Sequence, residues 1–84
     1  MNFIRNIHFT LLIRVNSRLH EFNFRKRGEM QYDADVSDDR GRRHFFKVIK
    51  DDSSWKIVPD TELPAWLINE QPVIISALME KDAS

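Results

Sequence analysis

Three histidines and one acidic run are the side chains of this 84-residue chain with the most obvious capacity for chemistry. The histidines His8, His20 and His44 come from separate segments. They therefore do not indicate a catalytic pair of a general acid and a general base with different pKa values. No serine or threonine stands at a strand-turn-helix elbow, and two glycines are too few for a phosphate-binding loop. We therefore predict a protein that is not an enzyme, with no catalytic residue, no cofactor-binding residue and no cofactor.

The acidic run has the alternating spacing of a calcium loop, with oxygen ligands at Asp33, Asp35, Ser37 and Asp39. The rest of that pattern is missing, because its sixth position is Asp38 where glycine is needed, and its twelfth is histidine where glutamate is needed. No helix carries a histidine pair four residues apart, as a zinc site would require. We predict no metal site and interpret the carboxylates as a strand edge followed by a turn.

A basic and aromatic stretch, Arg42-Arg43-His44-Phe45-Phe46-Lys47, is the remaining candidate. If it is a strand with Phe46 in the core, Phe45 must point to the opposite face, because side chains alternate. The residues that we expect on this opposite face form the candidate interaction surface: Arg43, Phe45, Lys47, Ile49, Lys56 and Val58.

Two functions compete for this surface. A ring among cations is the arrangement of single-stranded nucleic-acid binders, in which bases stack on the ring. However, Asp33 is expected opposite Lys47 and Asp38 opposite Arg42, which would neutralise much of the positive charge. An apolar patch of Phe45, Ile49 and Val58 then favours a protein partner or self-association as a homodimer. Single-stranded nucleic acid is the alternative ligand of the same face, and a patch with no specific role is the third reading.

The composition sets limits on partners and compartment. Thirteen Lys and Arg balance thirteen Asp and Glu, so no overall field attracts nucleic acid or an anionic membrane. The absence of cysteine fits a reducing interior. The longest apolar run near the amino end, Leu11-Leu12-Ile13, is far short of the roughly 20 residues that cross a bilayer. No cleavage site of a signal peptide follows it. We expect a cytoplasmic protein with no membrane contact.

Alternation of apolar and polar residues predicts the strands that carry these side chains. Even-numbered residues from Phe22 to Val36 are mostly apolar and the odd-numbered ones polar, which indicates a sheet with one wet face. A three-residue loop at Lys26-Arg27-Gly28 would place Gly28 in the left-handed conformation. The pairs expected across this loop are Arg25 with Glu29, Phe24 with Met30, and Phe22 with Tyr32.

Further hairpins follow by the same reasoning. A loop at Asp39-Arg40-Gly41, with Gly41 left-handed, pairs Ala34 with Phe46 and Tyr32 with Val48. A turn over residues 51–54 has an even number of residues, so the inward-facing positions change from even-numbered to odd-numbered. Trp55 and Ile57 then point inward beside Val48. Upstream, alternation over residues 9–15 predicts another strand that joins the sheet through a bend at Asn16-Ser17 without glycine.

The carboxyl-terminal part is predicted to be helical. Asp60 or Thr61 can cap a helix with Pro64 in its first turn, and apolar residues recur at helical spacing from Trp66 to Leu78. Pro72 lacks an N–H, so the helix either kinks there or restarts with Pro72 in its own first turn. The apolar stripe is expected to cover the inner face of the sheet.

The fold class predicted is therefore α+β, an antiparallel meander of four or five strands with a carboxyl-terminal helix packed on one face. We expect a single domain over residues 1–84, with a loose segment at 1–8, the sheet over 9–58 and the helix over 61–81, interrupted near Pro72. The predicted core consists of Phe22, Phe24, Tyr32, Val36, Phe46, Val48, Trp55, Ile57, Trp66, Leu67, Ile75 and Leu78.

The order of four antiparallel strands and then one helix, from Leu19 to Met79, resembles that of PUR repeats. This resemblance implies binding of single-stranded DNA or RNA, usually by two paired repeats. The outward face departs from a nucleic-acid face, since it carries Glu21, Asp33 and Asp35 where Arg and Lys would be preferred. In outline the chain also resembles small bacterial proteins, a resemblance that implies no activity.

Overall fold

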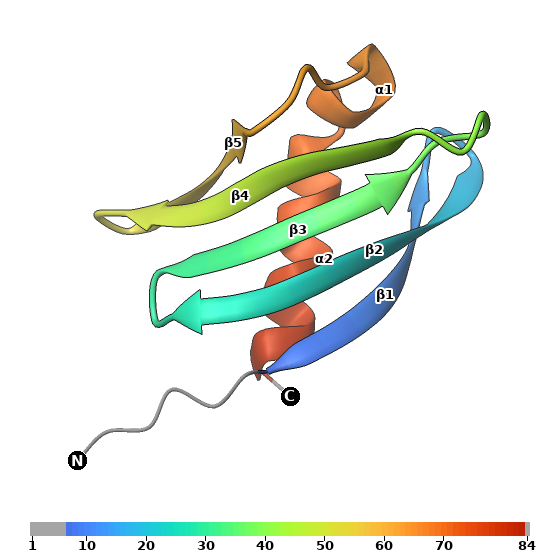
Figure 1. Ribbon diagram of the computed structural model, residues 1–84. Helices are drawn as coiled ribbons and strands as arrows, with labels where there is room; N and C mark the ends of the chain where they lie inside the picture. Colours follow the sequence, from blue (N-terminus) through green and yellow to red (C-terminus); the bar gives the residue numbers. More distant parts are fainter. Residues whose placement is uncertain (1–6, 84) are drawn as a thin grey trace.

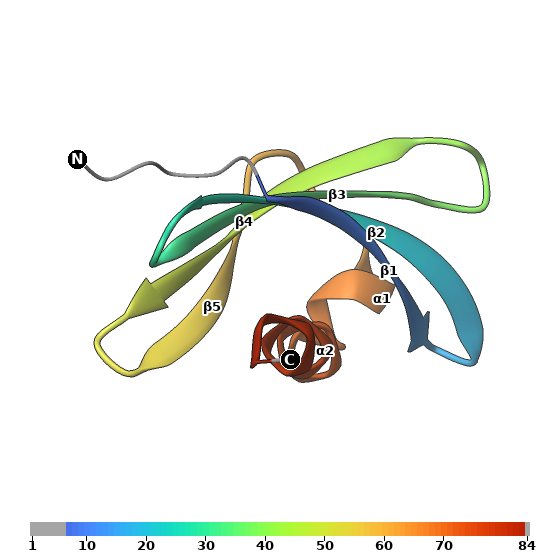
Figure 2. The ribbon, with the colours of Figure 1, turned by 90° about the horizontal axis from the view of Figure 1, so that it is seen from below.

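A five-stranded antiparallel sheet in the order β1-β2-β3-β4-β5 forms most of the computed structural model, which describes residues 7–83. The strands are His8–Val15 (β1), Arg18–Gly28 (β2), Gln31–Ser37 (β3), Arg43–Asp51 (β4) and Ser54–Pro59 (β5). Two helices follow, Ala65–Ile68 (α1) and Gln71–Ala83 (α2) (Figure 1). The sheet is strongly twisted and curves around α2 (Figure 2). The predicted α+β meander with its carboxyl-terminal helix is confirmed.

The turn between β1 and β2 forms without glycine. Asn16 and Ser17 both have positive φ, 56° and 68°, as a type I′ turn requires, and Val15 pairs with Arg18 across it. The predicted strand upstream of this bend is therefore present. The predicted loose segment at 1–8 lies outside the described residues except for Ile7 and His8, and His8 already belongs to β1.

The predicted pairing of β2 with β3 is wrong. Phe24 pairs with Ala34 and not with Met30, Phe22 pairs with Val36 and not with Tyr32, and Arg25 pairs with Asp33 and not with Glu29. The turn lies at Glu29-Met30, and a bulge lies between Lys26 and Gly28. The displacement is an even number of residues, so every side chain keeps its face, and alternation alone cannot distinguish the two registers. The observed register also pairs Lys26 and Gly28 with β3 and so extends the ladder.

The other two hairpins have the predicted register. Gly41 has a φ of 79°, Ala34 pairs with Phe46, and Tyr32 pairs with Val48. At the β4–β5 turn only Asp52 and Ser53 are unpaired, because Asp51 already faces Ser54, and this leaves Ile57 beside Val48 as expected.

The helical segment begins later than predicted. Neither Asp60 nor Thr61 caps a helix; Pro64 is the N-cap of the short α1. The chain then leaves the helical path and α2 starts at Gln71, with Pro72 in its first turn. Of the two possibilities for Pro72, restart and not kink is observed, because an N–H is not needed in the first turn of a helix.

The core lies between the concave face of the sheet and α2. Nine of the twelve predicted core residues are buried there, while Trp55, Trp66 and Ile75 are only partly buried at its margin. Met30, expected to point inward, is 60 % exposed because it lies in the β2–β3 turn. The buried residues outside the predicted list are Ile13, Val15, Ala34, Leu63 and Ile74.

Candidate interaction surface

The six predicted surface residues lie together on the convex side of β4 and β5, which we call the outer face. Their neighbours in sequence, Phe46, Val48 and Ile57, are buried in the core, so strand alternation turns these six the other way. Across the two strands Lys47 faces Val58, and Ile49 faces Lys56. The Phe45 side chain is 43 % exposed, whereas Ile49 and Val58 are half-buried.

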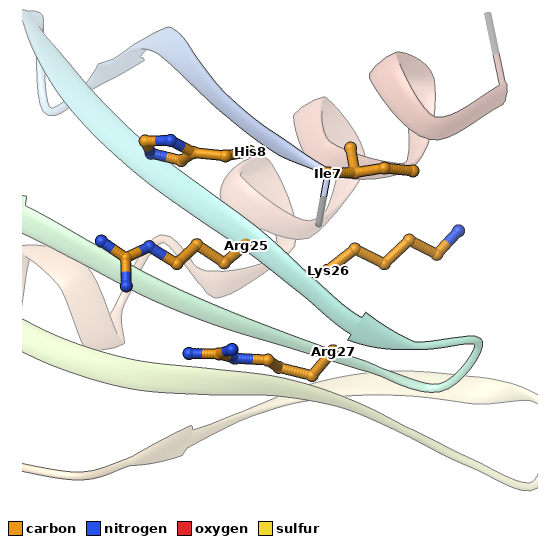
Figure 3. Close-up of a pocket in the computed structure, with 5 residues that line it drawn as sticks. All are labelled: Ile7, His8, Arg25, Lys26 and Arg27. Carbon is orange, nitrogen blue, oxygen red and sulfur yellow. The ribbon is translucent and has the colours of Figure 1, made fainter. Parts of the chain in front are cut away.

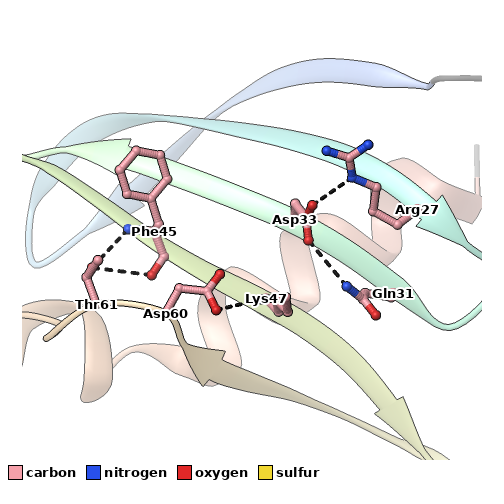
Figure 4. Close-up of polar contacts among 7 residues, drawn as sticks. All are labelled: Arg27, Gln31, Asp33, Phe45, Lys47, Asp60 and Thr61. Atoms are coloured by element: carbon pink, nitrogen blue, oxygen red, sulfur yellow. Dashed lines mark hydrogen bonds and ion pairs between the residues drawn. The ribbon is translucent and has the colours of Figure 1, made fainter.

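Carboxylates already hold the cations nearest to Phe45. Arg43 Nη1 lies 2.5 Å from Asp35 Oδ1, and Lys47 Nζ lies 2.6 Å from Asp60 Oδ1. The hydrogen bond from Lys47 to Asp60 is the main cause that raises the pKa of Lys47, so this amine stays charged. The two cations that flank Phe45 on this face, Arg43 and Lys47, are therefore both paired with carboxylates. Figure 4 shows the pair of Lys47 with Asp60.

The expected cross-strand charge pairs form differently in detail. Asp33 lies opposite Lys47 in the register, but its carboxylate accepts hydrogen bonds from Arg27 Nε at 2.6 Å and from Gln31 at 3.3 Å (Figure 4). Burial tends to raise the pKa of Asp33, but these bonds and the charges of Arg27 and Lys47 outweigh it and keep that pKa below its usual value. The charge is still neutralised, through different partners.

Asp38 likewise does not form an ion pair with Arg42. Its carboxylate accepts hydrogen bonds from the backbone N–H groups of Arg40 and Arg42, at 2.8 and 2.9 Å, and contacts His44 Nε2 at 2.9 Å. The hydrogen bond with His44 is the main cause that lowers the pKa of Asp38. The carboxylate therefore organises the β3–β4 turn.

The segment after β5 fixes the backbone at Phe45. The Thr61 hydroxyl accepts a hydrogen bond from the Phe45 N–H at 3.2 Å (Figure 4). The Phe45 carbonyl accepts from the backbone N–H groups of Asp60 and Thr61 at 3.1 and 3.3 Å. The residues expected to cap a helix instead extend the edge of the sheet past Pro59. They fix the backbone from which the aromatic ring projects.

The inward-facing histidines have structural contacts. The His20 ring stacks on Trp66 of α1, with centroids 4.3 Å apart and planes 11° from parallel. His44 contacts Asp38 as described above. Among residues 7–83, no group of three or more His, Asp and Glu side chains is arranged to hold a metal ion.

A cluster of basic residues that the sequence reasoning did not single out lies where β1 and β2 begin and end. Ile7, His8, Arg25, Lys26 and Arg27 line a shallow pocket of about 260 Å³. His8, Arg25 and Arg27 project to one side and Lys26 to the other (Figure 3). The signal in the sequence was the run Arg25-Lys26-Arg27, but its position beside His8 depends on the pairing of His8 with Arg25.

Comparison with known proteins gives no relative: no family model, no curated protein and no solved structure matches the chain. The resemblance to PUR repeats therefore remains a prediction. In the part of the chain that the structure describes, neither helix has the length and apolar character needed to cross a membrane.

Proposed function

We propose that the protein is a non-catalytic interaction module whose outer face binds the same face of a second copy. The observation that supports this proposal is the exposure of Phe45, 43 %, amid cations that already have carboxylate partners. Both described helices lie on the opposite side of the sheet (Figure 2). An apolar patch with neutralised charges around it is typical of a protein contact.

Charge balance favours a second copy as the partner. The chain has no net charge, and its outer face carries both signs in neighbouring pairs. When two such faces meet about a twofold axis, there is no net electrostatic repulsion between them. Phe45, Ile49 and Val58 of one copy can then pack against the same residues of the other. A stable contact needs about 800 Å² from each partner.

The proposal is tested by the mass of the particle in solution, measured by sedimentation equilibrium over a series of concentrations. Phe45→Glu places an unpaired charge in the contact and should halve the mass of the wild-type particle. Met30→Glu is the matched control, because Met30 is 60 % exposed in the β2–β3 turn, away from the outer face. An equal mass for Phe45→Glu and the wild type would overturn the face contact.

Single-stranded nucleic acid is the second candidate ligand of the outer face. It is favoured by one observation, the projection of Arg25 to the same side as His8, which adds a cation to this face beyond the ion-paired ones near Phe45 (Figure 3). Bases would stack on Phe45, and phosphates would contact the arginines.

This candidate is tested with a mixed-sequence single-stranded oligonucleotide at low salt, followed by the amide resonances and the tumbling rate of the labelled protein. Salt-sensitive shifts at Arg43, Phe45 and Lys47, with weaker binding by the alanine variant of each, would favour nucleic acid over self-association. An unmoved spectrum from a particle larger than the monomer would exclude it.

A further inference from the structure

The free edge of β1 carries hydrogen-bonding groups that the described chain leaves available to a partner. β1 is the first strand of the sheet and pairs only with β2. The N–H of Lys26 donates to the carbonyl of Ile7 at 2.9 Å, so Ile7 directs its backbone toward β2. Antiparallel pairing alternates, so Phe9, Leu11, Ile13 and Val15 also face β2. The residues in between, His8, Thr10, Leu12 and Arg14, direct their N–H and C=O groups to the free edge.

The sequence of β1 gives this edge little protection, because its one arginine, Arg14, lies near the end of the strand. The strand contains no proline and no lysine, which are the residues that commonly protect an edge from pairing. Leu12, near its middle, is 64 % exposed and is the most exposed large apolar side chain that the structure describes. Apart from Thr10, whose hydroxyl contacts Asn23 at 2.6 Å, no side chain among the four edge residues has a described hydrogen bond.

The opposite edge of the sheet is a poorer template. The N–H of Lys50 donates to Met30, so the even-numbered residues of β4 face β3 and the odd-numbered ones face β5. In β5 this leaves Trp55, Ile57 and Pro59 directed outward. Pro59 has no N–H to donate, and β5 has six residues where β1 has eight. A contact from β1 to β5 of another copy is therefore disfavoured, and pairing of β1 with itself is favoured.

We propose that β1 pairs antiparallel with β1 of a second copy, about a twofold axis at Leu11, and joins the two sheets into one. In this register His8 lies opposite Arg14 of the other copy, and Thr10 lies opposite Leu12. All four outward-directed residues then find backbone partners. A register centred on Leu12 would place His8 opposite Asn16, which belongs to the turn and has positive φ. The Leu11 register is the more complete one.

The inner side of the edge supports the same register. Leu11, Leu12 and Ile13 line a groove of about 320 Å³ with Ala77, Glu80 and Lys81 of α2. No residue of β2 lines it, so the groove opens on the free side of β1. With the axis at Leu11, Leu11 meets its own copy and Phe9 meets Ile13. Apolar side chains thus meet apolar side chains, and the half-buried Leu11 is covered.

Amide hydrogen exchange of the full chain tests this contact residue by residue. At high protein concentration the amides of His8, Thr10, Leu12 and Arg14 should exchange at least about tenfold more slowly than after dilution. The amides of Phe9, Leu11, Ile13 and Val15 should be protected at both concentrations by β2. If the first four amides exchange equally fast at both concentrations, the edge contact is overturned, whatever the mass of the particle.

A matched pair of variants gives the second test. Leu12→Lys places a charge on the free edge at an exposed position and should halve the mass of the wild-type particle, whereas Met30→Lys makes the same change in a turn and should not. A folded Leu12→Lys protein with the wild-type mass would overturn the proposal.

The variants distinguish the edge contact from the outer-face contact. If both form, the wild type is larger than a dimer, each of Leu12→Lys and Phe45→Glu leaves a dimer, and the double variant is a monomer. If only the face contact forms, Phe45→Glu alone abolishes the dimer and Leu12→Lys has no effect. If only the edge contact forms, Leu12→Lys alone abolishes the dimer and Phe45→Glu has no effect.

Discussion

Gly41 and Gly28 differ in backbone φ, the property that decides whether glycine is required at a position. Gly41 has a φ of 79° in the β3–β4 turn, whereas the φ of Gly28 lies outside the left-handed region, and neither would meet an atom within 4 Å of an added Cβ. Gly41→Ala should therefore lower the free energy of unfolding by about 1–2 kcal/mol, purely through backbone strain. Gly28→Ala should leave it unchanged or raise it by up to about 1 kcal/mol, because alanine restricts the unfolded chain. Urea denaturation of both variants measures the contrast; a larger loss for Gly28→Ala would contradict it.

Adjacent phenylalanines on β4 provide a second comparison at single residues. Phe46 is fully buried and touches Phe22, with ring centroids 6.3 Å apart, whereas Phe45 is 43 % exposed. Phe46→Ala should cost about 3–5 kcal/mol through lost burial and the cavity left behind. Phe45→Ala should cost less than about 1 kcal/mol in the monomer, since its ring loses little burial. Both are measured by urea denaturation at a concentration where the protein is monomeric. Equal losses would contradict the placement of Phe45 on the outer face.

At the scale of elements, the end of α2 is anchored to the sheet by a polar contact at the margin of the apolar interface. The buried Tyr32 of β3 donates its hydroxyl to Asp82, and Lys26 of β2 lies 3.3 Å from the same carboxylate. A carboxylate near the carboxyl end of a helix is unfavourable to the helix dipole, so these partners offset a local cost. The hydrogen bond from Tyr32 is the main cause that lowers the pKa of Asp82. Burial, followed by this same contact, raises the pKa of Tyr32 above its usual range.

The contact between Tyr32 and Asp82 should make the free energy of unfolding depend on pH. A carboxyl with a lowered native pKa stabilises the fold above its ordinary pKa, about 3.9, and that stabilisation is lost as pH falls through the native value. Tyr32→Phe should cost about 1 kcal/mol at pH 7, at the low end for a charged acceptor because Asp82 is partly exposed. The difference from the wild type should shrink toward zero below the native pKa of Asp82. Urea denaturation at pH 7 and at pH 2–3 checks this; a difference that is constant with pH would contradict it.

The strands and turns also show which features of the fold could be predicted from the sequence. Alternation predicted the face of most strand residues correctly, including Phe45, because burial on one side of a sheet imposes a period of two. It failed at residues 26–28, which were expected in a loop, and at Met30, which was expected to point inward. It did not locate the β2–β3 turn, since moving the turn by an even number of residues leaves every face unchanged. Glycine suggested a turn that ends at Gly28, but Gly28 is the last residue of β2 and pairs with Gln31 across the Glu29-Met30 turn. The partners of Asp33 and Lys47 were missed because Asp60 and Arg27 come from outside the paired residues.

At the scale of the whole molecule, α2 closes a core that the meander alone leaves open. Each strand pairs with its neighbours in sequence, so the sheet has two distant edges, and α2 contacts both β1 and β5. Leu67 of α1 and Ile74 and Leu78 of α2 are completely buried against the concave face. Without the helices, the large aromatic residues of that face would be exposed to water. Helix and sheet should therefore not be stable separately, and we expect them to unfold as one unit.

The two tryptophans allow this expectation to be tested at opposite margins of the core. Trp55 of β5 lies near Tyr32, with centroids 5.9 Å apart, whereas Trp66 of α1 stacks on His20 of β2. Trp66→Phe leaves Trp55 as a reporter of the sheet, and Trp55→Phe leaves Trp66 as a reporter of the helical segment. In each variant, the urea midpoint from tryptophan fluorescence should equal the midpoint from far-ultraviolet circular dichroism. Because the two probes are compared within one variant, a change in stability caused by the substitution does not affect the result. A fluorescence transition of Trp66 that precedes the loss of secondary structure would show that the helices detach before the sheet unfolds.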